Sequence, residues 1–195
     1  MSTTHQHEQQ LRSRPKRADA RRNHDKILSC ARDAFAEGGA SASLEEIARR
    51  AEVGIGTLYR HFPSRQALLE AVYVDEVEAL CRSAADLDGL PPWEALVRWL
   101  HRFVGYMVTK QALAPELLDY VGRDAPVFQE SRAALYAAGG PLLARAQDAG
   151  AVRRDTNLAE VIQLVGGIAK IQVSEPGEVD HILDIALDGL RYRAS

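Results

Sequence analysis

Thr57, Tyr59, Arg60 and His61 place four hydrogen-bonding side chains within five residues of the sequence. Hydroxyl and imidazole groups can donate hydrogen bonds to phosphate oxygens, and such bonds set the position of a protein on DNA. Arginine can bond O6 and N7 of a guanine together, so Arg60 is the candidate for reading a base. A structural alternative stays open for two of them, because Tyr59 can pack on a preceding helix and His61 can act as a cap. The chemistry that these residue types indicate is DNA recognition.

Two flanking residues extend this candidate DNA-contacting surface. Ser43 begins the preceding helix, where a hydroxyl and free backbone N–H groups can receive a phosphate. Arg65 follows the group and adds a positive charge for the phosphate backbone. The predicted DNA-binding residues are therefore Ser43, Thr57, Tyr59, Arg60, His61 and Arg65.

The stretch that positions these residues, 43–62, has the pattern of a helix-turn-helix. Ser43 and Glu46 form the S-x-x-E pattern of a capping box, in which the hydroxyl accepts a backbone N–H bond and the glutamate reaches back to the cap residue. Gly54 marks the turn, because glycine readily adopts the positive φ that such a turn needs. Apolar residues at helical spacing predict the buried faces, which are Leu44, Ile47, Ala48 and Ala51 in the first helix and Leu58 and Phe62 in the second.

The helix-turn-helix belongs to a longer motif that begins in the helix before it. Its members are Ile27, Leu28, Ala31, Phe35 and Gly38, then 44–48, 51–54 and 56–65. Through these residues the segment from about Ala18 to Tyr73 resembles the DNA-binding domain of the TetR/AcrR family of one-component repressors. Gly54 departs from the family, where many members carry Ser, and so does Arg65, where Lys is usual. The first change removes one possible DNA contact, whereas the second keeps the charge.

Charge is distributed unevenly along the 195 residues. Residues 1–65 carry 12 basic and 8 acidic side chains, whereas residues 66–195 carry 12 basic and 19 acidic ones. This asymmetry predicts that only the N-terminal third meets nucleic acid. Residues 1–17 are polar and lack periodicity, so we expect a disordered basic leader. The basic run over 12–26 is either a solvated leader or an arm that contacts phosphates or an adjacent minor groove.

Helical periodicity and a low aromatic content of 6% predict an all-α fold, and the family resemblance implies that this fold is TetR-like. We expect a three-helix helix-turn-helix domain over 18–65, a connecting helix over 64–87, and a C-terminal helical bundle for effector binding and dimerisation over 88–195. The total is about nine helices. Besides the two of the helix-turn-helix, they are expected at 17–37, 64–87, 93–109, 115–122, 126–149, 158–173 and 178–193.

The helix expected over 93–109 carries a broad apolar arc, so it is covered on more than one side. It is either plain bundle core or the wall of an internal cavity, and each of its apolar residues has the same two interpretations. Arg102, Asp119 and Arg123 can supply polarity to such a cavity, although nothing in the sequence selects them. The candidate effector-binding residues are Trp99, Phe103, Tyr106, Met107, Leu118, Tyr120 and Phe128.

The family resemblance implies that the last two helices pair with the same helices of a second copy. A dimer also suits DNA recognition, because one small head binds weakly and two heads can read a palindrome. Gly166 and Gly167 lower helix propensity in the first of these helices. They either let a partner helix approach closely or kink the helix, and both explanations remain open.

The sequence therefore predicts a sequence-specific DNA-binding transcriptional regulator, a repressor that a small-molecule effector releases from a palindromic operator. Its expected partners are double-stranded operator DNA, an effector that the sequence does not identify, and a second copy of the chain. Two alternatives are a DNA-binding structural protein without a ligand and an enzyme built on a helical bundle. No metal-ligand, phosphate-loop or nucleophile pattern supports the enzyme, so we expect no catalytic residue, metal or cofactor. Two scattered cysteines, with no signal sequence or membrane span, predict a cytoplasmic protein.

Overall fold

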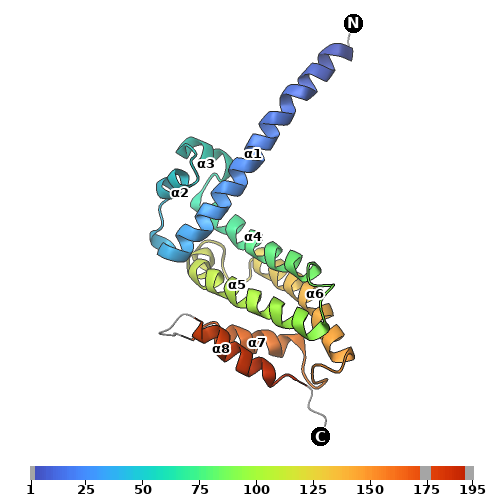
Figure 1. Cartoon of the computed structure of the whole chain (residues 1–195). Coiled ribbons are helices and arrows are strands. Elements are labelled where there is room, and N and C mark those ends of the chain that lie inside the picture. The colour runs from blue at the N-terminus through green and yellow to red at the C-terminus, as the bar shows by residue number, and fades with distance from the viewer. Residues whose placement is uncertain (1–2, 172–176, 192–195) are drawn as a thin grey trace. The chain divides into compact units, whose positions relative to one another are not determined.

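The computed structural model describes residues 3–171 and 177–191, and every regular element in them is a helix (Figure 1). Within these ranges no strand forms, and Val152 and Arg191 make one isolated bridge. The predicted all-α fold is confirmed. None of the described helices is both long and apolar enough to cross a membrane. The elements are α1 (Thr3–Gly38), the 3-10 turn η1 (Gly39–Ser41), α2 (Leu44–Arg50), α3 (Ile55–His61), α4 (Arg65–Ala85), α5 (Pro92–Val121), α6 (Pro126–Asp148), α7 (Leu158–Ile168) and α8 (Glu178–Asp188).

The described residues contain eight α-helices, which corrects the expected number of about nine. The helices expected at 93–109 and 115–122 are one continuous helix, α5. Residues 110–114 between them, Lys-Gln-Ala-Leu-Ala, are all good helix formers, so nothing ends the helix there. Pro115 lies inside α5 and removes one backbone hydrogen bond without ending the helix.

Helix α1 begins at Thr3 and not near Arg17, as the sequence pattern suggests. Residues 1–17 lack the apolar stripe that packs on a core, and this is why no helix was expected there. Many of these polar residues are nevertheless good helix formers, which favour a helix through local propensity. The structure does not describe the side chains of residues 1–17, so contact between this segment and DNA stays a prediction.

Residues up to Val72 form a first compact unit, in which α1 packs on α2 and α2 packs on α3. Spacings of four residues on α1 place Ile27, Ala31 and Phe35 on one buried face, as the sequence predicts. The core is completed by side chains from each of the other helices, namely Ile47 from α2, Leu58 from α3 and Leu68 from the start of α4. The unit therefore holds the short helices α2 and α3 against longer ones.

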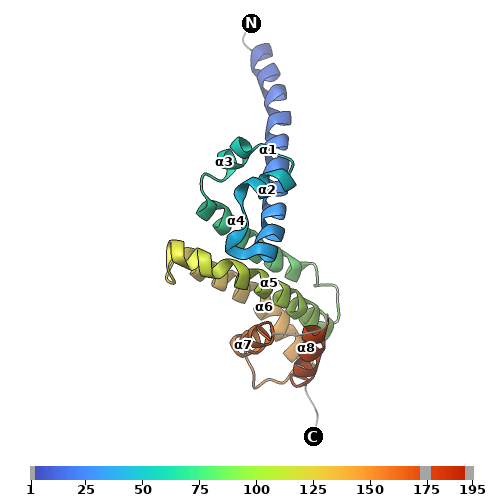
Figure 2. The ribbon, with the colours of Figure 1, turned by 90° about the vertical axis from the view of Figure 1, so that its left-hand side faces the viewer.

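Residues from Tyr73 onward form a second compact unit, in which α5 packs against α6, α7 and α8 (Figure 2). Trp99 of α5 is fully buried, and its indole N–H donates to the Leu80 carbonyl at 3.2 Å. Gly139 of α6 faces this ring: a Cβ atom there would lie 2.5 Å from Trp99. Only glycine lets α6 approach α5 this closely, so the Trp99–Gly139 contact sets the spacing of the two helices.

Helices α7 and α8 have 11 residues each and end before the expected boundaries of 173 and 193. α7 starts in a complete capping box: the Asn157 side chain accepts from the Glu160 N–H at 3.1 Å, and the Glu160 carboxylate accepts from the Asn157 N–H at 3.0 Å. The predicted cap pair at this position is confirmed.

Candidate nucleic-acid interface and internal cavity

Ser43 caps α2, and its Oγ accepts a hydrogen bond from the Glu46 backbone N–H at 3.1 Å. The reciprocal half of the predicted capping box does not form. The Glu46 carboxylate instead accepts bonds of 2.7 and 2.8 Å from Arg49 and one of 2.8 Å from Arg50. Bonds between two charged groups are stronger than a bond to a neutral N–H, which explains the preference. These bonds lower the pKa of Glu46 to about 2.

The turn between α2 and α3 places its positive φ at Glu52, with a value of 56°. The expectation that Gly54 supplies this conformation is wrong, because Gly54 has φ −70° and ψ 146°. Its extended backbone is the usual conformation of a residue that precedes the first turn of a helix. The Glu52 carboxylate also accepts a bond from the Lys26 amine at 2.9 Å, which connects the turn to α1.

Helix α3 is short and has clearly different inner and outer sides. Leu58 is fully buried and Phe62, at the end of the helix, is buried as well. On the outer side Tyr59 is 45% exposed and Arg60 is exposed. Ile55 at the start of α3 is 38% exposed and was not among the predicted site residues. Its exposure adds an apolar group to the outer side.

Thr57 and His61 are half-buried, between the inner and outer sides of α3. The His61 ring lies 6.0 Å from the His24 ring of α1 and 6.3 Å from the Phe62 ring. His61 therefore packs within the unit while part of it stays accessible. An added Cβ at Gly56 would meet no atom within 4 Å, so nothing in the described unit covers the backbone there.

The arginines near α3 differ in whether they have a carboxylate partner. Arg49 bonds to Glu46, and Arg50 bonds to both Glu46 and Glu37, with the Glu37 bond at 2.7 Å. In the part of the chain that the structure describes, Arg60 pairs with no carboxylate. Its guanidinium is thus the exposed cation of α3 that keeps its donors available for another molecule.

Arg65 holds together residues within the first unit. Its guanidinium donates to the Ala42 carbonyl and lies 5.0 Å from the centre of the Phe35 ring. These contacts connect the start of α4 to the segment just before α2. The side chain predicted as a phosphate contact therefore also has a packing role.

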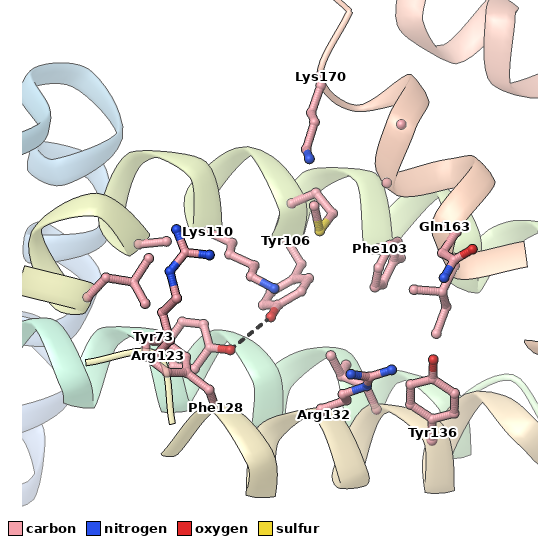
Figure 3. Close-up of a pocket in the computed structure, with 17 residues that line it drawn as sticks. Tyr73, Phe103, Tyr106, Lys110, Arg123, Phe128, Arg132, Tyr136, Gln163 and Lys170 are labelled. Carbon is pink, nitrogen blue, oxygen red and sulfur yellow. Dashed lines mark hydrogen bonds between the residues drawn. The ribbon is translucent and has the colours of Figure 1, made fainter. Parts of the chain in front are cut away.

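A cavity of about 620 Å³ lies in the second unit, between α5, α6 and α7 (Figure 3). Three helices and the start of the second unit supply its wall. The lining residues are Tyr73, Phe103, Tyr106, Met107, Lys110, Ala114, Leu118, Arg123, Phe128, Arg132, Leu135, Tyr136, Ile162, Gln163, Gly166, Gly167 and Lys170.

Aromatic rings form a continuous part of this wall. Tyr73 meets Phe128 edge-on with ring centres 5.4 Å apart, and Phe103 lies 5.7 Å from Tyr106. The Tyr106 hydroxyl donates to the Tyr73 hydroxyl at 3.3 Å. Burial, followed by the neighbouring Tyr73, raises the pKa of Tyr106 far above its ordinary value. The hydroxyl therefore stays protonated and acts as a neutral hydrogen-bonding group.

The described residues contain neither a metal-ligand cluster nor a cysteine with a lowered pKa. Within 3–171 and 177–191 no three His, Cys, Asp or Glu side chains gather in a way that could hold a metal ion. Burial raises the pKa of both thiols, Cys30 and Cys81, which makes them poor nucleophiles.

Two family models match separate parts of the chain. Residues 27–72 match the model described as bacterial regulatory proteins of the tetR family. Residues 91–192, more than half of the chain, match the model described as the C-terminal domain of SbtR-like transcriptional regulators. The chain belongs to the TetR family of transcriptional regulators. It is a DNA-binding regulator from a family of regulators and not of enzymes.

Solved TetR-family structures match this regulator over most of its length. A TetR transcriptional regulator from Streptomyces coelicolor is 41% identical, with a TM-score of 0.78 over 88% of this chain and 99% of that one. A TetR transcription regulatory protein from Mycobacterium vanbaalenii is 36% identical, with a TM-score of 0.73 over 91% of this chain and 99% of the other.

Among curated relatives, the HTH-type transcriptional regulator UidR of Escherichia coli (strain K12) is 35% identical over 92 residues. That match spans 46% of the present chain and 41% of UidR.

The cavity of this TetR-family regulator contains five of the seven residues named from the sequence as effector-binding candidates. They are Phe103, Tyr106, Met107, Leu118 and Phe128. The other two lie elsewhere: Trp99 is packed on Gly139, and Tyr120 is 48% exposed with its hydroxyl 3.5 Å from Glu116. Of the residues considered for polarity, Arg123 lines the cavity, whereas Arg102 and Asp119 do not.

Sequence reasoning missed most of the polar lining, which includes Lys110, Arg132, Tyr136, Gln163 and Lys170. Helical spacing was an available signal. Lys110 lies four residues after Tyr106, and Arg132 and Tyr136 lie four and eight residues after Phe128, so they share a face with aromatic residues already chosen.

Gly166 and Gly167 also line the cavity, and α7 is continuous through both. An added Cβ at Gly166 would lie 3.7 Å from Met107, and one at Gly167 would meet nothing within 4 Å. The pair therefore leaves space at the cavity wall, a role not considered from the sequence.

Proposed function

We propose that this regulator is a repressor that a small molecule releases from a palindromic operator by binding in the cavity of the second unit. The cavity is the observation that carries the proposal. Its volume of about 620 Å³ lies within the range of roughly 300–1,000 Å³ that small-molecule sites occupy. Aromatic and apolar side chains from α5 and α6 line it together with a few polar groups, which is the composition expected of a small-molecule site.

The outer side of α3 is the proposed DNA-reading surface. Arg60, exposed and without a carboxylate partner in the described residues, would bond a guanine in the major groove. Tyr59, Thr57 and His61 would donate to phosphates and fix the position of α3. Ser43 and Arg65 would add contacts to the DNA backbone, in addition to their bonds within the unit.

A homodimer is proposed from exposed apolar side chains on α7, on α8 and just after α7. Leu164 of α7 is 43% exposed, Ile185 of α8 is 61% exposed, and Ile171, which follows α7, is 44% exposed. Burying apolar surface releases roughly 25 cal/mol per Å², so a second copy that covers these residues would be stabilised. Two heads in one dimer would also read two half-sites, which supports a palindromic operator.

Effector action is proposed as a shift between conformations of the dimer. A ligand can shift such an equilibrium only when it binds the two conformations with different affinities. Preference for the conformation that fits DNA less well would lower operator affinity, and operator DNA would lower ligand affinity by the same factor. Because the protein acts on DNA, the proposed location is the cytoplasm.

The test combines DNA fragments from around the regulator's own gene with footprinting of the purified protein. We expect protection of a site with two-fold symmetric half-sites, and loss of protection when the matching small molecule is added. Binding that depends on salt but not on sequence would instead favour a DNA-binding structural protein.

A cavity-filling variant separates ligand response from DNA binding. Gly166→Leu places a side chain toward Met107 in the cavity and should keep operator affinity while losing the response to ligand. Gly140→Leu is the matched control, because Gly140 is also helical, has open space around its Cβ and does not line the cavity. Equal ligand responses in the two variants would contradict the proposed site.

A further inference from the structure

The cavity wall collects positive charge within an acidic part of the chain. Lys110, Arg123, Arg132 and Lys170 line it, and none of the lining residues is acidic. Residues 66–195 contain 12 basic and 19 acidic side chains, so this wall holds four of the 12 cations and none of the 19 carboxylates. The sign of charge in the cavity is therefore opposite to that of the unit around it.

In the described residues, these four cations also lack the carboxylate partners that other cations of the second unit have. Arg98, for example, bonds to Glu94 at 2.6 Å, and Arg145 to Asp88 at 3.3 Å. Among the described residues no carboxylate forms an ion pair with Lys110, Arg123, Arg132 or Lys170.

Two of the four, Lys110 and Arg132, lie close to aromatic rings. The Lys110 amine lies 5.9 Å from the centre of the Tyr106 ring, and the Arg132 guanidinium lies 5.6 Å from the centre of the Tyr136 ring. Burial, followed by the charges of Lys170 and Arg132, lowers the pKa of Lys110. Burial and the two neighbouring positive charges thus disfavour the charged form of Lys110 in this partly open site, and a bound anion would offset that effect.

The wall combines polar and apolar groups, which suit the two parts of one amphipathic molecule. Figure 3 shows Arg132 and Tyr136 reaching from α6, and Lys170 from the turn after α7, toward the same space. The rings of Tyr73, Phe103 and Phe128 provide an apolar surface beside them. Guanidinium groups bind carboxylate, sulfonate and phosphate groups through paired N–H donors.

We propose that the ligand of this cavity is a small amphipathic anion, with an aromatic or aliphatic body and one acidic group. Arg132, Lys110 and Lys170 hold the acidic group, Tyr136 and Gln163 donate to it, and the aromatic rings contact the body. The inference rests on the proposed function, in which this cavity receives the effector, and adds the chemical class of that effector.

Two fluorescent probes with the same ring system test the class directly. Anilinonaphthalene sulfonate carries an anionic group, and N-phenylnaphthylamine is the corresponding molecule without it. Titration of the full-length protein with each probe gives two dissociation constants. We expect the sulfonate to bind at least about tenfold more tightly, because one charge-assisted hydrogen bond is worth about that factor.

Charge variants then assign the preference to the cavity. Arg132→Gln and Lys170→Gln should each weaken sulfonate binding about three- to tenfold and leave the neutral probe unchanged. Arg132→Lys should retain most of the preference because it keeps the charge. Arg154→Gln is the control, since Arg154 is exposed, bonds to Asp148 and does not line the cavity. Equal affinities of wild type for the two probes, or equal losses for both probes in the cavity variants, would overturn the proposal.

Operator-binding measurements with the same probes separate this inference from the proposed function. Charge-dependent probe binding without any change in operator affinity would leave the anionic class standing and would contradict the effector role. Release from the operator by the neutral probe, but not by the sulfonate, would leave the effector role standing and would contradict the anionic class.

Discussion

Arg60 and its neighbour Tyr59 occupy the same outer side of α3 but have different chemistry available to them. The guanidinium can discriminate between bases, because it matches two acceptors of guanine. A tyrosine hydroxyl directed at a phosphate carries no sequence information. Substitutions at these two positions should therefore change different properties of DNA binding.

We predict that Tyr59→Ala weakens binding to all sequences by a similar factor. Arg60→Ala should reduce the preference at one base pair by about 1–3 kcal/mol and have a smaller effect on DNA that already lacks that base. Binding isotherms on the operator and on its single-base variants measure both effects. Wild-type affinity and wild-type preference in both variants would refute the proposed roles.

Glu52 carries the positive φ of the turn, a conformation that residues with a Cβ atom adopt at a cost. Asparagine tolerates this conformation better than glutamate does. Glu52→Asn should therefore raise the melting temperature by about 2 °C, although it loses the exposed bond to Lys26, since such surface pairs contribute little.

The control for this position is Glu52→Ala. It loses the same bond to Lys26 without gaining tolerance for the left-handed backbone, so thermal unfolding should place it below wild type. A melting temperature for Glu52→Ala equal to or above that of Glu52→Asn would show that strain at the turn is not the dominant effect.

At the scale of elements, the Glu46 carboxylate of α2 forms ion pairs that the S-x-x-E capping-box pattern does not predict. Glu46 bonds to Arg49 and Arg50 and not to the cap, and these bonds lower its pKa to about 2 from an ordinary value of 4.5. The folded state is therefore stabilised by this carboxylate above pH 4.5, and the contribution falls as the pH approaches 2.

Glu46→Gln should consequently be less stable than wild type at pH 6, and the difference should disappear near pH 2. Denaturant unfolding across this pH range provides the measurement. Glu45→Gln is the matched control, because Glu45 is the adjacent exposed carboxylate and forms no ion pair in the described part of the chain. A pH-independent difference for Glu46→Gln would argue against the ion pairs as its cause.

The elements could be predicted wherever apolar residues mark one face, as in α1 from Ile27 to Phe35 and in the helix-turn-helix from Leu44 to Phe62. Local motifs were less informative about which partner a polar group chooses. The Glu46 carboxylate bonds to two arginines and not to the cap residue. The turn has its positive φ at Glu52, whereas Gly54 adopts an extended conformation that any residue can adopt. The continuity of α5 through Pro115 was also hidden, since a proline normally suggests a helix boundary.

The cavity was only partly predictable, for a related reason. Aromatic residues such as Phe103 and Phe128 stand out as candidates because large aromatic side chains usually lie either in the core or in the wall of a pocket. A lysine or arginine on the same face looks like a solvated residue, and only the tertiary structure shows that half-buried Lys110 and exposed Arg132 line the same partly open cavity. Trp99 shows the opposite error, because its ring fills the gap left by Gly139 and does not reach the cavity.

At the scale of the whole molecule, the proposed homodimer depends on few exposed side chains, so single substitutions should affect it strongly. Leu164→Arg and Ile185→Asp each place a charge on a surface that a second copy would bury. We expect both variants to elute as monomers at micromolar concentration and to lose most operator affinity, because one head binds weakly.

Size-exclusion chromatography with light scattering measures the oligomeric state. Val108→Asp serves as the control, since Val108 is 55% exposed on α5 and lies on neither α7 nor α8. A wild-type protein that is monomeric under these conditions would contradict the proposed dimer. The proposed interface would also be contradicted if Leu164→Arg and Ile185→Asp both remained dimeric.

The contact between Trp99 and Gly139 has an optical consequence. The sequence contains two tryptophans, and the Trp99 ring lies 6.0 Å from Phe103, which borders the cavity. The other, Trp93, lies beneath the Arg191 guanidinium at 4.7 Å. Replacing Trp93 with phenylalanine would leave one buried indole next to the cavity wall. Its emission would then report ligand entry without an added label, so that any chemical library can be screened by the protein's own fluorescence.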